Sequence, residues 1–390
     1  MVNKLLDPAQ TGHSAESLEA DLRKRVVGQG EAIQQVISIY QTYLAGLSGP
    51  GRPIGNFLFL GPTGSGKTLL VEATAESVVG HAHAVIKIDC SEFQHSHEIA
   101  KLIGSPPGYL GHRDTHPLLS QEVLDAKQTE RAKLNFVLFD EIEKASDSLW
   151  NLLLGILDKA TLTTGDNRTV DFSRALIFLT SNLGASEMSS ILHPRLGFAS
   201  SEVTRRHTAG WTDEQLRDKL RRAGLEAARR KFTPEFMNRI DRTVVFSPLG
   251  ELELRKILIL ELNIVQRRIF NSLGSGAFVF SLTEAAKDYL LTEGTDLKYG
   301  ARHLKRCIDR HLLQPLSNLI GSGQVFGGDL IEVDWDVGRS RLTFVRVADS
   351  LPPYVMAQMI DTTVAQHRAA RSAGATTAQT RTVNLRPLRR

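Results

Sequence analysis

The stretch NFLFLGPTGSGKT, residues 56–68, decides the fold of this chain. A short apolar run leads into a glycine-rich turn, and the run LLVEATAESVV after the turn has the composition of a helix. The turn fits the pattern GxxxxGK[ST] in the context that gives the pattern its meaning, after a strand and before a helix. Backbone N–H groups and a helix N-terminus together cradle phosphates. The stretch therefore predicts an α/β domain that binds ATP.

Each part of this phosphate loop has an expected contribution. Lys67 would reach the β- and γ-phosphates, and the Thr68 hydroxyl would ligate Mg²⁺. Glycines let the backbone approach the anion because no Cβ stands in the way. A glycine-rich turn with a surface lysine is the alternative, and it leaves the strand and helix context unexplained. The expected nucleotide-binding residues of the loop are Gly61, Pro62, Thr63, Gly64, Ser65, Gly66, Lys67 and Thr68.

A second source of carboxylates follows the apolar run FVLF and resembles a Walker B strand. Asp140 would hold Mg²⁺ through water, and Glu141 would orient and polarise the attacking water. Asn182, in LTSN at the end of the next apolar run, could touch the γ-phosphate or its water. An asparagine at a strand end is, taken alone, more often a turn former.

The rest of the chain extends the α/β pattern. Further apolar runs, AVIKID, NFVLFD, ALIFLTSN and TVVF, alternate with helical stretches such as SLWNLLLGILDKA, which predicts a parallel sheet with helices on both faces. After Pro248 the pattern becomes mostly helical, with the short strand-like runs LIEVDW and RLTFVRV. We expect a lead at 1–25, a large ATPase domain at 26–247, a smaller mainly helical domain at 248–347 and a basic, disordered tail at 348–390.

Composition narrows the class of protein. The 390 residues predict two or three domains, and 42% hydrophobic with 23% charged residues is typical of a soluble globular protein. Two cysteines cannot form a disulfide framework, and no stretch is long and apolar enough to span a membrane, so we expect a cytoplasmic protein. The net charge of +4 is accounted for by an arginine-rich tail, which argues against a folded nucleic-acid-binding face.

Five motifs in order carry a family resemblance: GPTGSGKT, FVLFDEIEKA, NRTVDFSRALIFLTSNLG, FTPEFMNRIDRTVVF and KYGARHLKR. From about Val26 to about Val347 the chain resembles the Clp ATPases of the AAA+ superfamily, and in particular the second ATPase module of the two-ring Clp chaperones. The resemblance implies a P-loop AAA+ fold, ATP and Mg²⁺ as cofactors, and assembly into a homo-oligomeric ring, a hexamer. It also implies a protein-unfolding ATPase that threads substrate polypeptide through the ring pore, with unfolded or misfolded proteins as its partners.

The resemblance also assigns residues outside the loop. Val26 and Val27, with Gly28 and Gln29, match the segment that lines the adenine pocket. Arg239 matches the arginine finger that reaches the γ-phosphate in a neighbouring subunit, and Arg302 matches the sensor arginine of the small domain. Without the resemblance, both arginines would be interpreted as surface charges or ion-pair partners.

Two further segments bear on the substrate and on a partner. Gly108, Tyr109, Leu110 and Gly111 match the aromatic pore loop that grips polypeptide. Leu196, Gly197 and Phe198 resemble the tripeptide by which some Clp unfoldases dock on a ClpP-type peptidase, although such a tripeptide also serves as a loop anchor. We therefore expect the ATP-binding subunit of a ClpP-type protease or, alternatively, a stand-alone chaperone or disaggregase. Any proteolysis would belong to the partner, and no nucleic acid or membrane partner is expected.

The chain also departs from the family. Only about 25 residues precede Val26, so we expect no amino-terminal substrate-recognition domain, which leaves substrates and adaptors undefined. His303 stands where the family usually has proline. The segment 112–133 differs from the usual glycine-rich run after the pore loop, which puts the second pore contact in doubt.

Overall fold

The computed structural model describes Asp7 and residues 11–105, 117–130, 132–192, 212–296 and 300–359. The chain divides into two compact units. The first comprises Met1–Glu253 together with Asp296–Arg302, and the second comprises Leu254–Thr295 and His303–Arg390. In the described ranges every helix is too short or too polar to cross a bilayer.

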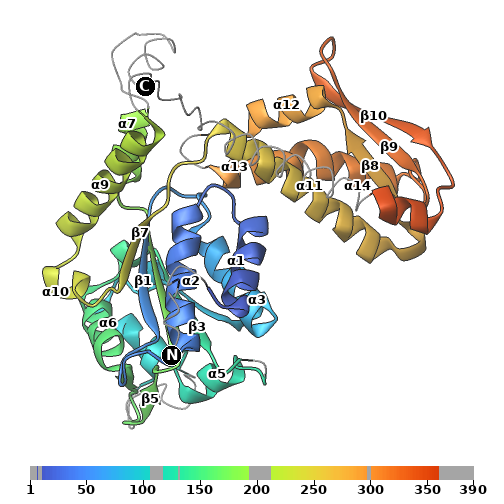
Figure 1. Ribbon diagram of the computed structural model, residues 1–390. Helices are drawn as coiled ribbons and strands as arrows, with labels where there is room; N and C mark the ends of the chain where they lie inside the picture. The colour runs from blue at the N-terminus through green and yellow to red at the C-terminus, as the bar shows by residue number, and fades with distance from the viewer. Residues whose placement is uncertain are drawn as a thin grey trace, which may run out of the picture. The chain divides into compact units, whose positions relative to one another are not determined.

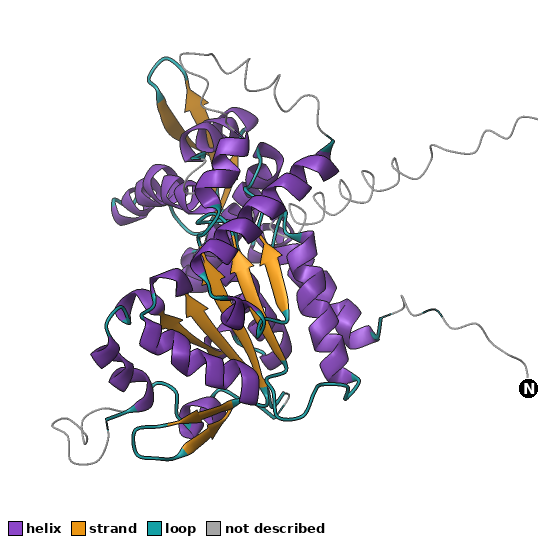
Figure 2. Cartoon of the chain, turned by 90° about the vertical axis from the view of Figure 1, so that its left-hand side faces the viewer, coloured by secondary structure: helices purple, strands orange, loops and turns teal. Residues whose placement is uncertain are grey.

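A five-stranded parallel sheet forms the centre of the first unit (Figures 1 and 2). Its strands, in spatial order, are β2 (Val85–Asp89), β3 (Asn135–Asp140), β6 (Ala175–Ser181), β1 (Gly55–Leu60) and β7 (Arg242–Val245). All four neighbouring pairs are parallel, so the carboxyl ends of the strands meet at one edge. The five predicted strands and the α/β class are confirmed.

Both faces of this sheet are buried, because side chains alternate along each strand. On β1, Phe57 and Phe59 pack with helices α1, α2 and α3, whereas Leu58 and Leu60 belong to the core on the opposite face, beside α6. Figure 1 shows the helices divided in this way. Near-continuous apolar runs are therefore required, and they are what made the strands visible in the sequence.

In the first unit, α1 and α2 precede β1, and the other helices lie between strands along the chain. The helices of this unit are α1 (His13–Arg25), α2 (Gly30–Leu44), α3 (Lys67–Val79), α4 (Ala100–Ile103), α5 (Gln121–Ala126), α6 (Asp147–Lys159), α7 (Ala185–Leu192), α9 (Asp213–Lys231) and α10 (Pro234–Met237). Short 3₁₀ turns lie at Ala82–Ala84, Cys90–Glu92, Ser96–Ile99 and Ile142–Lys144. A two-stranded hairpin, β4 (Thr161–Thr163) and β5 (Thr169–Asp171), was not predicted from its three-residue strands.

Helix α1 lies in the segment that the sequence analysis treated as a lead. The structure instead packs it into the first unit, where Ala15, Leu18 and Leu22 are buried in the same core as Phe57 and Phe59. These residues recur at helical spacing and form one apolar stripe. The structured part of the first unit therefore begins before Val26.

The second unit is mainly helical with a small sheet, as predicted. Its elements are α11 (Glu251–Leu273), which begins at the end of the first unit, β8 (Val279–Leu282), α12 (Glu284–Gly294), α13 (Ala301–Ile308), whose first two residues belong to the first unit, α14 (Gln314–Gly321), β9 (Leu330–Asp336) and β10 (Arg341–Ala348), with a 3₁₀ turn at Gly274–Gly276. The sheet order is β10-β9-β8, antiparallel between β9 and β10 and parallel between β8 and β9. A last helical stretch covers 353–359.

The stretch 301–321 is helical but not uniformly so. Between α13 and α14 the chain makes a π-helical turn, Asp309–Leu313. Pro315 follows this turn and has no N–H to donate to a carbonyl one helical turn earlier. The wider turn accommodates the proline without ending the helix.

Candidate functional site

The phosphate loop leaves the carboxyl end of β1 and enters α3 at Lys67. Gly61, Gly64 and Gly66 have φ of 133°, 75° and 102°, in a region that residues with a Cβ rarely adopt. A Cβ added to Gly61 would also overlap the backbone oxygen of Phe246, at the end of β7. Glycine at these positions is therefore a requirement of the backbone as well as of an approaching anion.

Lys67 is the most deeply placed charge of the loop, with 7% of its surface exposed. Its Nζ donates to the carbonyls of Gly61 (2.7 Å) and Pro62 (2.9 Å) and to Oδ1 of Asn182 (3.1 Å). Burial lowers the pKa of Lys67 to about 8, against the opposing effect of the neighbouring carboxylates, chiefly that of Asp140. A lysine held in this way can exchange carbonyl oxygens for phosphate oxygens.

The two expected Walker B carboxylates lie at the end of β3, two strands from the loop. Asp140 closes the strand, and Glu141 follows in a left-handed conformation with φ of 56°. The Thr180 hydroxyl on β6 donates to Oδ1 of Asp140 and accepts the backbone N–H of Glu141 at 3.3 Å. The Glu141 carboxylate is paired with Lys144. The two acidic residues are thus anchored to the adjacent strand.

Asn182 connects these carboxylates to the phosphate loop. Its Oδ1 accepts from the Thr63 hydroxyl at 3.2 Å as well as from Lys67, and its Nδ2 donates to Oε1 of Glu141 at 3.3 Å. Its backbone N–H donates to Oε1 of Glu143 at 3.1 Å. Because β6 lies between β3 and β1, Asn182 occupies the position between the lysine and the glutamate.

The segment that begins at Val26 flanks the loop. Val26 and Val27 are buried, and Val26 is the side chain nearest to the open side of Gly66. Gln29 is 5% exposed and its amide donates to the carbonyls of Ser65 (3.1 Å) and Ser247 (3.0 Å). Gln29 therefore ties the start of α2, the phosphate loop and the exit of β7 together.

The start of α13 lies against the same loop. The N–H of Ala301 donates to the carbonyl of Gly64 at 3.2 Å, and Gly300 has φ of 52°. Arg302 is near enough for its charge to contribute to the lowered pKa of Lys67, after the larger effect of burial. The predicted sensor arginine is thus brought to the phosphate side of the first unit.

Arg239, by contrast, does not lie beside the phosphate loop. Its carbonyl accepts from Nδ2 of Asn56 at the beginning of β1, and its guanidinium contacts Asp158 (3.8 Å) and Glu235 (3.3 Å). The strand rise of about 3.3 Å per residue puts the beginning of β1 roughly 16 Å from Gly61. Within one chain, this arginine therefore lies at the opposite end of β1 from the phosphate loop.

The donors for a magnesium ion fit its chemistry. Thr68 is the second residue of α3, and Asp140 has one carboxylate oxygen bonded to Thr180 and a second that is not used by that bond. Mg²⁺ is held by one or two such oxygens, by waters and by the phosphates of its nucleotide. Among the described residues no cluster of three or more His, Cys, Asp or Glu side chains forms a metal site. The pair suits a nucleotide-linked cation and would hold it only together with ATP.

Some predicted residues lie outside the described part of the chain. These are the pore-loop residues Gly108, Tyr109, Leu110 and Gly111 and the docking tripeptide Leu196, Gly197 and Phe198. Conversely, Thr180 and Glu143 were not predicted from the sequence. Both stand in motifs that carry the family resemblance, two residues before Asn182 and two residues after Glu141, and the polar threonine in an apolar strand was the available signal.

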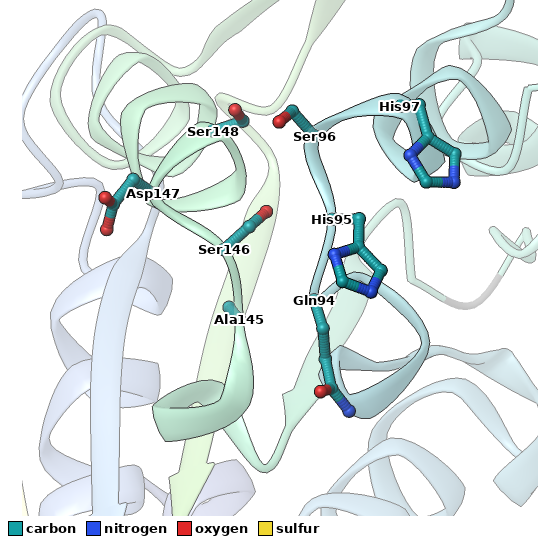
Figure 3. A pocket seen from close by; sticks show the side chains of 8 residues that line it. All are labelled: Gln94, His95, Ser96, His97, Ala145, Ser146, Asp147 and Ser148. Carbon is teal, nitrogen blue, oxygen red and sulfur yellow. The ribbon is translucent and has the colours of Figure 1, made fainter.

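Near the site a hollow of about 620 Å³ separates two short segments (Figure 3). The rings of His95 and His97 stack with centroids 5.7 Å apart. The hollow is lined by Gln94, His95, Ser96, His97, Ala145, Ser146, Asp147 and Ser148. None of the predicted nucleotide-binding residues belongs to this lining, so the hollow is separate from the phosphate loop.

Two protein families match two successive parts of this chain. Residues 52–243 match the family described as AAA domain (Cdc48 subfamily), and residues 249–333 match the C-terminal, D2-small domain, of ClpB protein. The ATP-dependent Clp protease ATP-binding subunit ClpC of Staphylococcus aureus strain USA300 is 38% identical over 320 residues, 82% of this chain and 36% of that protein. ClpC of Staphylococcus saprophyticus matches to the same extent. The chain thus spans about a third of the length of these relatives.

Solved structures of Hsp104 match most of this chain. The closed state of Hsp104 with ATPγS and FITC-casein covers 85% of this chain and 52% of its own, with 29% identity and a TM-score of 0.68. The extended conformation of the S. cerevisiae Hsp104–casein complex covers 86% and 53%, with 29% identity and a TM-score of 0.69.

Proposed function

The chain belongs to the Clp ATPases of the AAA+ superfamily, and we propose that it is an ATP-dependent protein unfoldase that hydrolyses ATP at subunit interfaces of a ring. The observation that carries the proposal is the convergence of Lys67, Asn182 and Glu141 at one edge of the sheet while Arg239 lies at the other end of β1. The site has a phosphate binder and a base but takes its arginine from another chain.

The residues of this chain divide the chemistry among themselves. Lys67 and the backbone of Gly64 and Gly66 would bind the phosphates, and Thr68 with Asp140 would hold Mg²⁺. Glu141, fixed through Oε1 by Asn182, orients water for attack on the γ-phosphorus. ATP and Mg²⁺, when bound, supply the group that is transferred and the positive charge that offsets its oxygens.

Arg239 completes the site in trans. Its guanidinium is held by carboxylates of α6 and α10 at the surface, and its side chain is 25% exposed. An arginine finger from a neighbouring chain stabilises the charge of the transition state only when the ring has formed. We propose a homo-oligomeric ring, a hexamer by the family resemblance, in which turnover depends on assembly.

Unfolding follows from coupling turnover to a moving grip. Tyr109 and Leu110, flanked by Gly108 and Gly111, would press on extended polypeptide of any sequence, because apolar contact needs no particular partner. Hsp104 has been solved with casein, which supports a protein substrate for this chain as well. The substrate class we propose is unfolded or misfolded protein.

Two fates of the unfolded chain remain as candidates. The ClpC relatives are named as ATP-binding subunits of a protease, which favours delivery to a ClpP-type peptidase through Leu196, Gly197 and Phe198. The Hsp104–casein structures favour a stand-alone chaperone or disaggregase. The protease subunit is the first candidate because both ClpC relatives are more similar in sequence to this chain.

ATP turnover is tested by mixing variants. Arg239→Ala has an intact site without a finger to offer, and Glu141→Gln has a finger but no base. Each alone is expected to bind ATP and hydrolyse little, and a mixture is expected to regain turnover where a Glu141→Gln chain supplies its arginine to an Arg239→Ala site. Two inactive variants that stay inactive when mixed, despite forming mixed rings, would refute the shared site.

Unfolding is tested with a stably folded fluorescent reporter. ATP-dependent loss of fluorescence is expected for the native chain and for the aromatic control Tyr109→Phe, and is expected to disappear in Tyr109→Ala. An added ClpP-type peptidase makes the loss irreversible if the first candidate is right. Turnover with no loss of fluorescence in the native chain would exclude threading of that substrate.

A further inference from the structure

Thr180 is a buried polar residue on β6, the central strand of the five-stranded sheet. The proposed function assigns it no role. It is 1% exposed and lies on β6 in the otherwise apolar run ALIFL-T-S. Its hydroxyl makes two hydrogen bonds, one to the carboxylate of Asp140 and one from the N–H of Glu141. A single side chain on one strand thus contacts both acidic residues at the end of the next.

We propose that Thr180 is a positioning residue for ATP hydrolysis, which holds Asp140 in the orientation that presents its second oxygen to Mg²⁺ and holds Glu141 in the conformation that aims its carboxylate at the attacking water. The proposal rests on the ATP hydrolysis proposed above and adds a residue to it. Thr180 contacts Asp140 and Glu141 and acts through these two neighbours.

The bond to Asp140 fixes one carboxylate oxygen. A hydroxyl donating to Oδ1 restricts rotation of the carboxylate, because rotation would break a partly buried, charge-assisted hydrogen bond. The remaining oxygen then keeps one direction. Residues that orient a metal-binding carboxylate in this way are commonly worth about 10- to 100-fold in metal affinity or activity.

The hydrogen bond from the Glu141 N–H to Thr180 supports an unfavourable backbone conformation. Glu141 has φ of 56° and ψ of 46°, which a non-glycine residue adopts only with outside support. Its N–H reaches the Thr180 hydroxyl at 3.3 Å, while Asn182 and Lys144 hold the two carboxylate oxygens. Asn182 and Lys144 thus fix the position of the Glu141 carboxylate, and Thr180 fixes the position of the Glu141 backbone N–H.

The hydroxyl is the essential group, which allows an isosteric test. Thr180→Val keeps the shape and removes the hydroxyl, and Thr180→Ser keeps the hydroxyl on a smaller side chain. Thr74 is the matched control, because it is also fully buried in the first unit and its hydroxyl serves only the carbonyl of Leu70 within α3, at 2.7 Å. Thr180→Ala removes the hydroxyl without an apolar replacement and stands in if the valine variant does not fold.

Steady-state ATP hydrolysis at saturating ATP and Mg²⁺ is the first measurement. We expect kcat to fall about 10- to 100-fold in Thr180→Val, and to remain within about threefold of the native value in Thr180→Ser and Thr74→Val. A Thr180→Val chain that keeps more than half of the native kcat, or a Thr180→Ser chain as impaired as Thr180→Val, overturns the proposal.

Binding of a fluorescent ATP analogue, with Mg²⁺ and with EDTA, is the second measurement and needs no turnover. In EDTA all variants are expected to bind alike, because Lys67 and the loop are unchanged. The gain in affinity on adding Mg²⁺ is expected to shrink about tenfold in Thr180→Val alone. A full Mg²⁺ gain in Thr180→Val overturns the role toward Asp140, and weakened binding in EDTA shows damage to the loop and overturns it too. Native chain that binds ATP without hydrolysing it counts against the proposed function, while this measurement still decides on Thr180.

Discussion

Replacing Asn56 by alanine should destabilise the first unit and loosen the support of Arg239. Asn56 has no exposed surface and stands one residue into β1. Its Nδ2 donates to the carbonyls of Leu157, near the end of α6, and of Arg239, both at 3.0 Å. Its own N–H donates to the Asp241 carboxylate at 2.8 Å, a bond that the substitution leaves in place.

The magnitude follows from the groups left without a donor. Leaving the buried carbonyl of Leu157 without a donor costs about 2 kcal/mol of the free energy of unfolding. Leaving the partly buried carbonyl of Arg239 without one costs about 1 kcal/mol. The space left by the amide adds about 1 kcal/mol. Oδ1 of Asn56 is buried without a hydrogen-bond partner, so its removal stabilises the variant by about 1 kcal/mol. The free energy of unfolding of the first unit is therefore expected to fall by about 3 kcal/mol.

Urea denaturation followed by circular dichroism measures this loss. Asn151→Ala is the control, because Asn151 is an exposed residue of the same helix α6, and its substitution is expected to change stability by less than about 0.5 kcal/mol. If Asn56→Ala costs no more than Asn151→Ala, the two carbonyls do not depend on the amide and the reasoning fails.

The same variant has a functional consequence. The phosphate loop is at the other end of β1, so ATP binding is expected to be unchanged while turnover of the assembled protein falls with the displacement of Arg239. Mixed with Arg239→Ala chains, the double variant Asn56→Ala, Glu141→Gln is expected to restore less turnover than Glu141→Gln alone. Equal restoration would show that Arg239 keeps its position without Asn56.

Three further predictions concern the phosphate loop. Because the pKa of Lys67 is lowered to about 8, its ammonium is charged well below that pH and must take up a proton to bind phosphate well above it. ATP affinity, measured by titration, should be flat at lower pH, begin to fall near pH 8, and fall by up to about tenfold per pH unit above it, whereas Lys67→Arg should show no such step. Gly61→Ala should abolish ATP binding through its clash with the backbone at the end of β7, while Gly49→Ala, with open space around it, should bind normally in the same assay. Gln29→Glu cannot donate to the carbonyl of Ser65 and should weaken ATP binding about tenfold; an unchanged affinity in calorimetry would show that this bond does not set the loop.

The sequence was most informative where a signal is local. The central strands β1 and β6 are buried at every position, so each appears as a short apolar run. The phosphate loop is a contiguous turn whose glycines are dictated by backbone conformation. By contrast, β4 and β5 are three residues long, and three residues carry no period that can be recognised. The π turn before Pro315 could have been anticipated from the proline, which removes one helical donor.

By itself the sequence determined the α/β class, the phosphate loop with Lys67, and the acidic pair Asp140 and Glu141, because those features depend on neighbours in the chain. The tertiary structure decided which strand ends meet. With β6 placed between β3 and β1, Asn182 contacts Lys67 and Glu141. The same sheet sends Arg239 to the far end of β1. Periodicity specifies that a strand exists and which faces are buried, but strand order results from packing across distant segments, and only packing brings these side chains together or apart.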